Sequence, residues 1–352
     1  MTTDLLGPIA DEELEQPVDP ACSQLGIPIH QCDMAKAIER IGEFVEIGRS
    51  TGRSHQVVTV NADFLVTARR EADVHAILRG ADLSLADGMP IVWASSALGV
   101  RLPERVAGAD LVPALAESAI VRGHKIMLFG GLAGSAKTSA DVLRSENPGL
   151  LVESLECPVG PKGETEERDL EQIRAFAPDI ICVALGHPKQ ERWIRLHAEA
   201  LGVPVAVGVG GTLDFIAGQR KRAPGWVRTI GFEWLFRMLQ EPQRLTKRYL
   251  GGFTVFVPAI AQQITLMGFG DQFRRTVARV DCAPYATPAI SLSSGRIGRE
   301  TVEELTDAAS RLRSLGATPT MALPSYRQSR ALTREGLDRL FHFVPQDQPI
   351  SS

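Results

Sequence analysis

Short apolar runs alternate with amphipathic segments through the middle of the chain. Each run ends in polar or glycine residues, and apolar residues at helical spacing follow it. The runs are "QVVTVN", "HKIMLFGG", "APDIICVALG" and "PVAVGVGG", and the segments after them are "FLVTARREADVHAILRGAD", "SAKTSADVLRSE", "KQERWIRLHAEALG" and "TLDFIAG". Strands that alternate with helices form a parallel sheet covered on both faces. We therefore predict an α/β, Rossmann-like fold with a parallel sheet flanked by helices.

Polar and glycine residues follow each predicted strand, and ligands of such sheets bind at the carboxyl ends of the strands. Glycines there let a ligand approach the backbone and leave the N–H groups of the next helix open to an anion. The pattern favours a phosphorylated ligand, although any one glycine alone is explained as well by a tight turn. The residues at these strand ends are Thr59, Asn61, Asp87, Gly88, Gly130, Gly131, Gly186, His187, Gly208, Gly210 and Gly211.

Asp87 is the acid of "LSLADGMPIVWASSALG", where an apolar run gives way to glycine. A carboxylate at a strand end can act as a general base that takes a proton from an attacking hydroxyl. It can equally form an Asx-type turn or cap the helix that we expect to begin near Pro90. The residues alone leave both interpretations open.

Two nucleotide-binding motifs are incomplete. "GLAGSAKT" approaches the P-loop pattern, but Ala136 stands where that pattern needs glycine. "GVGGTLD" lacks the spaced glycines and the later acid of a dinucleotide site, which argues against a nicotinamide-dependent oxidoreductase. His187 has no second histidine or cysteine at metal-ligand spacing, so we expect it to have a structural or ligand-positioning role and predict no metal site.

Composition narrows the class of protein. The chain has 352 residues and a formal net charge of −4, whereas general nucleic-acid binders carry a basic balance. The five cysteines include no CxxC pair, which indicates neither a zinc knuckle nor a disulfide framework. Residues 1–24 are acidic and contain proline, as in a disordered leader and unlike an export signal. These features favour a cytoplasmic protein that does not bind nucleic acid.

Residues 219–250 differ from the rest of the chain because cations and aromatic residues are interleaved there. A solvated helix face could explain the charges, but the tryptophans favour contact with phosphates or an anionic membrane surface. The cations are Arg220, Lys221, Arg222, Arg228, Arg237, Arg244, Lys247 and Arg248, set against Glu233 and Glu241. Residues 251–270 are apolar but are interrupted by Pro258 and two glutamines. They are short for a membrane span, so we expect an interfacial or packed helix.

The last part of the chain, residues 283–345, is predicted to form a small α/β extension with strand, helix, strand and helix in order. Through "SRLRSLGA" and "GLDRLFHF" it resembles the second half of a STAS domain, without the first half. A regulatory or docking module and a plain structural extension both remain open.

Eight motifs in order resemble the WecG/TagA/CpsF family of bacterial glycosyltransferases. The likeness runs from about Ile27 to Leu250, with residues 25–218 as the catalytic core. It implies inverting transfer of an N-acetylmannosamine-type sugar from UDP to N-acetylglucosamine on a polyprenyl diphosphate, in cell-surface polysaccharide or teichoic-acid synthesis. The motifs are "TVNADF", "ADGMPIVWASSALG", "ERVAGADL", "LGHPKQERWI", "GVGGTLDFIAG", "RAPGWV", "GFEWLFRMLQEP" and "RLTKRYL".

The resemblance assigns Asp87 as the catalytic base and the other matched positions as the donor site. Arg105 is suited to the departing diphosphate, since guanidinium offers a fixed fork of donors, and Asp214 matches the position at the uracil. Lys247 replaces an arginine of the appendage, which keeps charge but loses bidentate geometry. The donor-binding set is Thr59, Asn61, Arg105, Gly186, Gln190, Gly210, Gly211, Asp214, Arg237, Arg244 and Lys247.

The matched region contains no DxD motif, so we predict that catalysis needs no metal and that cationic side chains neutralise the diphosphate. The resemblance also implies peripheral attachment to the cytoplasmic face of the membrane, where the lipid acceptor lies. A nucleotide-sugar sensor without catalysis, with the C-terminal extension as its output, is the alternative function. The sequence leaves the oligomeric state open, with a homo-oligomer among the options.

Overall fold

The computed structural model describes the core of the chain continuously and the C-terminal part in pieces. The residues that it describes are 21–225, 227, 233–240, 251–264, 278–281, 289–292, 302–303, 305–307, 309–310, 320–322, 332, 337 and 342–344. Most of the predicted leader therefore lies outside the described residues, as do Arg244, Lys247 and the end of the predicted apolar helix, residues 265–270.

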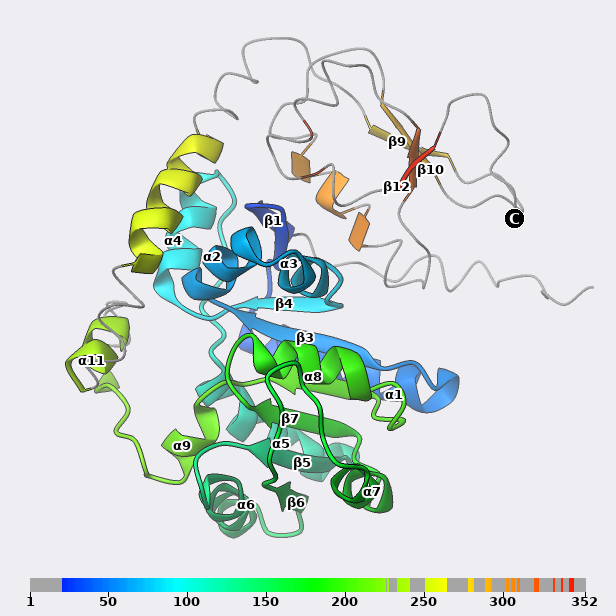
Figure 1. Ribbon diagram of the computed structural model, residues 1–352, viewed down its shortest axis with the longest axis vertical. Helices are drawn as coiled ribbons and strands as arrows, with labels where there is room; N and C mark the ends of the chain where they lie inside the picture. The colour runs from blue at the N-terminus through cyan, green and yellow to red at the C-terminus, as the bar shows by residue number, and fades with distance from the viewer. Residues whose placement is uncertain are drawn as a thin grey trace, which may run out of the picture.

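A six-stranded parallel sheet forms the centre of the molecule (Figure 1). Its strand order is β4-β3-β8-β7-β5-β6, and every neighbouring pair is parallel. The predicted α/β class with a parallel sheet is confirmed. The strands are β3 (His55–Val60), β4 (Leu83–Ala86), β5 (Lys125–Gly130), β6 (Leu151–Leu155), β7 (Ile180–Ala184) and β8 (Val205–Gly208).

Helices cover both faces of this sheet because consecutive strand residues are apolar and point alternately to its two sides. Val57 and Ile126 pack toward α1, α5 and α6, whereas Val58 packs toward α2 and α3 and Met127 toward α7 and α8. The helices are α1 (Met34–Thr51), α2 (Ala62–Arg70), α3 (Ala72–Arg79), α4 (Met89–Ala97), α5 (Gly108–Arg122), α6 (Ser135–Glu146), α7 (Glu167–Phe176), α8 (Lys189–His197), α9 (Thr212–Ile216) and α11 (Glu233–Gln240).

The segment after β3 is two helices where the periodicity predicts one. Glu71 has extended backbone angles, φ −121° and ψ 106°, and separates α2 from α3. Its carboxylate accepts a hydrogen bond from Arg192 of α8, which also binds Asp73. The break thus places two carboxylates against one arginine of a neighbouring helix, a tertiary contact that periodicity does not report.

An antiparallel hairpin precedes the parallel sheet, and it corrects the predicted end of the leader at residue 24. Its strands are β1 (Ala21–Gln24) and β2 (Ile27–His30), joined by Leu25 and Gly26 at positive φ. Residues 21–24 therefore belong to the buried core and not to the leader. Long-range hydrogen bonds hold the hairpin: Ser84 N donates to His30 Nδ1, and Gln263 Nε2 donates to Ser23 O.

Residues 251–264 form a helix that packs on the core. Phe256 and Ile260 are buried in one cluster with the hairpin and with α2, α3 and α4. The sequence predicts either an interfacial or a packed helix for this segment, and the inner face of the helix is packed on the core. Among the described helices, none is both long and apolar enough to cross a bilayer.

The described strands of the C-terminal extension form a second sheet in the order β12-β11-β10-β9. β10, β11 and β12 are parallel and β9 is antiparallel to β10. The predicted strands at β10 and β11 are present, but "GLDRLFHF", predicted as helix, ends in strand β12, because its last residues pair with β11. The strands are β9 (Ala278–Asp281), β10 (Ala289–Leu292), β11 (Thr320–Ala322) and β12 (His342–Val344). The STAS resemblance stays a prediction.

Candidate active site

A cavity of about 470 Å³ opens at the carboxyl ends of β3, β4, β5, β7 and β8. It brings together every predicted site residue of the core, although these come from positions far apart in the chain. Those residues are Thr59, Asn61, Asp87, Arg105, Gly186, Gln190, Gly210, Gly211 and Asp214. The predicted appendage cations are described only in part. Arg237 lies on α11, but its side chain is outside the described part of the structure, and Arg244 and Lys247 lie outside the described residues.

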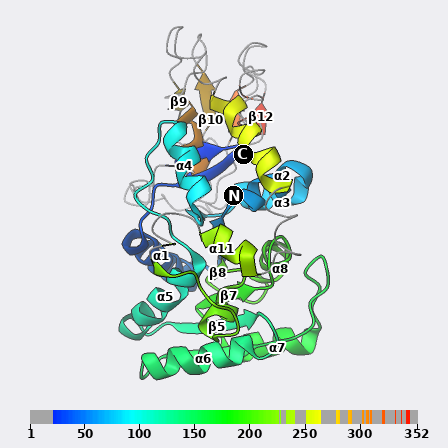
Figure 2. The ribbon, with the colours of Figure 1, turned by 90° about the vertical axis from the view of Figure 1, so that its left-hand side faces the viewer.

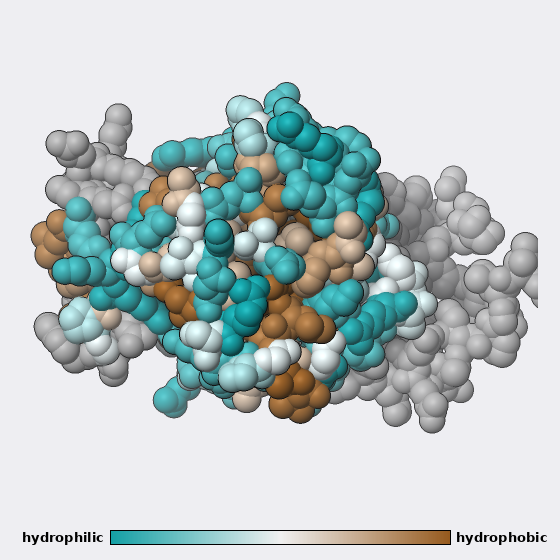
Figure 3. Space-filling model, turned by 90° about the horizontal axis from the view of Figure 1, so that it is seen from below, coloured by the Kyte–Doolittle hydropathy of each residue, from teal (hydrophilic) through white to brown (hydrophobic). Residues whose placement is uncertain are grey.

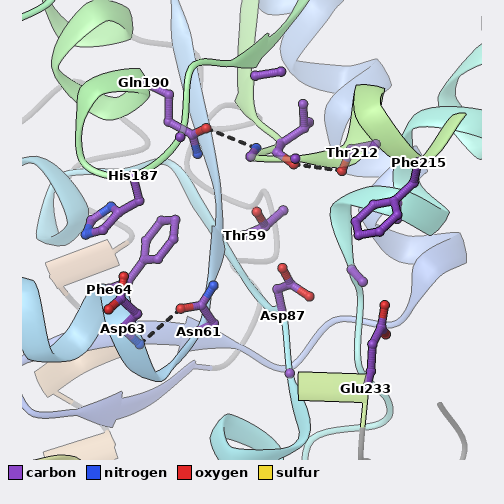
Figure 4. A pocket seen from close by; sticks show the side chains of 18 of the residues that line it. Thr59, Asn61, Asp63, Phe64, Asp87, His187, Gln190, Thr212, Phe215 and Glu233 are labelled. Carbon is purple, nitrogen blue, oxygen red and sulfur yellow. Dashed lines mark hydrogen bonds between the residues drawn. The ribbon is translucent and has the colours of Figure 1, made fainter. Parts of the chain in front are cut away.

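Asp87 stands directly after β4, facing the cavity between Asn61 and Glu233 (Figure 4). Its backbone N–H donates to Val60 O at 2.8 Å, which continues the β3–β4 ladder and fixes the residue in place. Gly88 follows at φ 126°, a conformation that L side chains rarely adopt, and it occupies the N-cap position of α4 without a side-chain bond. Gly88, and not Asp87, is therefore the N-cap residue of this helix, and the carboxyl group of Asp87 is 28% exposed.

Arg105 lies at the centre of a charged network on this wall of the pocket. Its guanidinium is 3.8 Å from Asp87 Oδ1, 3.0 Å from Glu233 Oε2 and 3.3 Å from Asp110 Oδ2. Arg222 binds the same Asp110 at 2.5 Å and lies 3.7 Å from Glu233. Three carboxylates thus surround two guanidinium groups, and a ligand phosphate that binds Arg105 competes with them.

The charges of this network keep Arg222 protonated despite its burial. Desolvation works to lower the pKa of Arg222, but the hydrogen bond and charge of Asp110, with the charges of Glu233 and Asp87, outweigh it and raise that pKa. The positive charge at this position is therefore constant over the physiological pH range.

A second wall of the pocket, at the ends of β3, β7 and β8, carries neutral side chains whose polar atoms bind other parts of the protein. Gln190 is fully buried; its Oε1 accepts from Gly210 N at 3.0 Å and its Nε2 donates to Glu191 Oε1 at 2.7 Å. Thr59 Oγ1 donates to Gly208 O at 2.9 Å, and Asn61 Oδ1 accepts from Asp63 N and caps α2. The sequence predicts that these groups orient the ligand, whereas in the structure their main contacts shape the wall itself.

Asp214 organises the loop after β5. Its Oδ1 accepts from Leu132 N and from Ser135 Oγ, each at 2.9 Å, and its Oδ2 lies 3.5 Å from Arg220. Gly131 enters this loop at φ 90°, where an added Cβ would lie 2.9 Å from Ser135 Cβ. The loop geometry therefore depends on both the glycine and the buried carboxylate.

The P-loop-like segment has its helix N-terminus occupied from within the protein. Glu156 accepts from Gly134 N at 2.7 Å and from Ala136 N at 2.9 Å at the start of α6. A carboxylate satisfies the N–H groups that a phosphate would need. This contact agrees with the sequence-based argument against a P-loop NTPase.

His187 is buried beside the pocket in an apolar and acidic setting. Its ring stacks on Phe64 with centroids 3.8 Å apart (Figure 4). Its Nδ1 lies 2.9 Å from Glu191 Oε2. The peptide bond to Pro188 is cis. These contacts describe a residue that orders the β7–α8 turn, consistent with the expected structural role.

Sequence reasoning missed several residues that line the cavity. Glu233 and Arg220 reach it from the appendage, and Phe215 and Phe253 add apolar wall. The signal available for Glu233 was an acid within an otherwise basic segment. Within the part of the chain that the structure describes, His, Cys, Asp and Glu form no group of three or more able to hold a metal ion.

Comparison with known proteins agrees with this geometry. A profile of the glycosyl transferase WecG/TagA/CpsF family matches residues 22–267. A protein of Bacillus subtilis (strain 168) called N-acetylglucosaminyldiphosphoundecaprenol N-acetyl-beta-D-mannosaminyltransferase is 30% identical over 190 residues, which cover 53% of this chain and 72% of that protein. A protein of the same name from Staphylococcus aureus (strain MW2) is 29% identical over 238 residues, 68% of this chain and 91% of the relative. The chain thus belongs to the WecG/TagA/CpsF family of glycosyl transferases.

Proposed function

We propose that this protein transfers an N-acetylmannosamine-type sugar from UDP to N-acetylglucosamine carried on a polyprenyl diphosphate, with inversion at the anomeric carbon. The product belongs to cell-surface polysaccharide or teichoic-acid-type synthesis. The names of the similar proteins from Bacillus subtilis and Staphylococcus aureus support the sugar and the acceptor. The observation that carries the proposal for this chain is the pairing of Asp87 with Arg105 at the open end of the parallel sheet.

In the proposed reaction, a hydroxyl oxygen of the acceptor sugar attacks the anomeric carbon of the donor. Asp87 takes the hydroxyl proton as the new C–O bond forms, and the bond from the anomeric carbon to the diphosphate breaks. UDP leaves with the bonding electrons, and its added negative charge lies near Arg105. One carboxylate is enough for a single inverting displacement, since the leaving group departs from the opposite face.

The surrounding residues have supporting tasks in this mechanism. Gln190 and Asp214 hold the turns after β8 and β5, so that the backbone N–H groups there keep a fixed position toward the donor. Arg222 keeps Asp110 and Glu233 partly neutralised beside Arg105. The appendage cations Arg237, Arg244 and Lys247 are proposed to complete the diphosphate site, and no metal is invoked.

The direct test is a transfer assay with a panel of UDP-sugars and a lipid-linked N-acetylglucosamine diphosphate. We expect UDP release and a disaccharide product with UDP-N-acetylmannosamine or its uronic acid, and a β-linked product from the α-linked donor. Binding of UDP-sugar without transfer to any acceptor would favour the sensor alternative instead, which no comparison supports.

The protein is further proposed to work peripherally on the cytoplasmic face of the membrane. The basic aromatic segment 219–250 and the lipid-linked acceptor support this. Because Phe256 and Ile260 belong to the core, truncation near Gly218 would also expose apolar core surface. Replacing Arg244, Lys247 and Arg248 by serine is the cleaner variant, and we expect it to weaken binding to anionic liposomes.

A further inference from the structure

Two helices that border the pocket contain no charged residue. They are α4, together with the residues after it to Val100, and the helix of residues 251–264. By contrast, α6 and α7 carry exposed charged side chains, such as Asp141 and Arg174. The end of the molecule that carries them has a largely hydrophilic surface with separate apolar patches (Figure 3). A solvated helix face normally carries polar or charged residues, so the uncharged pair marks a surface of another kind.

This uncharged surface begins in the pocket. Met89 and Phe253, near the starts of the two helices, line the cavity. Four residues further along each helix are Trp93 and Val257, whose exposed fractions are 47% and 56%. Residues i and i+4 lie on the same helix face, so the cavity wall continues outward on both helices. We call Met89, Trp93, Phe253 and Val257 the apolar rim.

The two helices are held together by a shared core. Ile91 and Ala94 of α4 belong to the same buried cluster as Phe256 and Ile260. Figure 2 shows both helices on one side of the molecule, above α11 in that view. Their inner faces are therefore fixed, and the exposed members of the apolar rim stand on one side of the pocket opening.

We infer that the apolar rim binds the polyprenyl chain of the acceptor. The inference rests on the proposed function: the sugar and diphosphate of the acceptor enter the polar cavity, and the isoprenoid chain has to leave it. That chain has no charge and no hydrogen-bonding group, so an uncharged wall that starts at the reaction site suits it. Its burial removes apolar surface from water on both partners. A protein interface has a polar, solvent-accessible border, and neither helix contributes a charged residue to one.

The test compares acceptors that differ only in their chain. N-acetylglucosamine diphosphate is supplied on a long polyprenyl chain and on a short alkyl chain, both in detergent. We expect wild type to prefer the long chain in kcat/KM, and the double variant Trp93→Ser, Val257→Ser to lose about tenfold of that preference. Leu196→Ser is the matched control, because Leu196 is 55% exposed on α8, away from the pocket, and it should keep the preference.

A second measurement does not depend on transfer. Polyprenyl phosphate without sugar is titrated into wild type and into Trp93→Phe, and tryptophan fluorescence is recorded for both. The difference between the two signals reports on Trp93. A saturable change assigned to Trp93 supports the inference even if no UDP-sugar is transferred, in which case the proposed function alone fails.

Folded serine variants with an unchanged chain preference, or no fluorescence response from Trp93, would overturn the inference. The double serine variant is also tested for binding to liposomes. If it binds them less but keeps the wild-type chain preference, the apolar rim contacts the bilayer and not the acceptor chain, and the inference is overturned.

Discussion

The two walls of the pocket use polar residues differently. On the wall formed by the ends of β3, β7 and β8, Thr59 and Gln190 are 3% and 0% exposed and are bonded to the protein itself. On the wall formed by the end of β4, the loop before α5 and α11, Asp87, Arg105 and Glu233 have side chains 28%, 15% and 16% exposed, and both carboxylates are paired with Arg105. The first wall fixes the shape of the pocket, and the second carries its charged groups. A substitution on the first wall should therefore lower mainly the stability of the protein, and one on the second mainly the transfer rate or ligand affinity.

The largest effect is expected at Asp87. Asp87→Asn keeps the shape but removes the base, so the transfer rate should fall by about 10²- to 10⁴-fold. The affinity for UDP should change far less, because Asp87 lies farther from Arg105 than Glu233 does. Steady-state kinetics and UDP titration measure the two quantities, with thermal unfolding of the same sample as the check on folding. Asp141→Asn on exposed α6 is the control. Near-normal turnover by a folded Asp87→Asn protein would end the assignment of Asp87 as base.

A substitution on the neutral wall should act on stability first. Gln190→Ala removes the hydrogen-bond partner of Gly210 N and of Oε1 of the buried Glu191, which costs about 1–3 kcal/mol in the free energy of unfolding. Urea denaturation should show this loss, and Gln172→Ala, at an exposed position of α7, should not. If Gln190→Ala instead kept full stability and lost only donor affinity, Gln190 would be a direct ligand and the contrast between the walls would be wrong.

Glu233→Gln should make the charged wall more receptive to phosphate. The substitution removes one carboxylate that competes for Arg105, so the Kd for UDP should fall by roughly threefold, and more at low salt than at high salt. Isothermal titration measures it, and Glu199→Gln at an exposed site serves as control. Weaker UDP binding would mean that Glu233 positions Arg105 for the ligand and does not compete with it.

The smallest effect is expected from removal of metal ions. If Arg105 and the appendage cations neutralise the diphosphate, turnover should be unchanged by excess EDTA. Complete loss of activity that magnesium or manganese restores would show that a metal shares the charged wall with Arg105. Such a result would leave the neutral wall unaffected and would revise the charged one.

Much of the fold and of the candidate site could be predicted, because strands and helices depend on residues that are close together in the sequence. Short apolar runs followed by segments of helical periodicity located the strands after which Asn61, Asp87 and Gly186 lie. Parallel strands place their carboxyl ends at one edge, so the gathering of these residues in one cavity followed from the alternation. The roles of Gln190 and Asp214 could not be predicted in this way, since their bonds are to turns 20 and 82 residues away in the chain.

By itself, the sequence determined the α/β class and the strand ends, because local periodicity and turn chemistry encode them, and its resemblance to a known family singled out Asp87 as the candidate base. Only the tertiary structure decided that residues 21–30 form a buried hairpin and that Glu233 reaches Arg105 across 128 positions. It also decided that residues 251–264 pack on α4 and extend the pocket with an uncharged surface. Apolar burial and charge pairing stabilise these contacts between segments that are distant in the chain. The local sequence pattern does not indicate which distant segments come together, so these pairings could not be predicted from it.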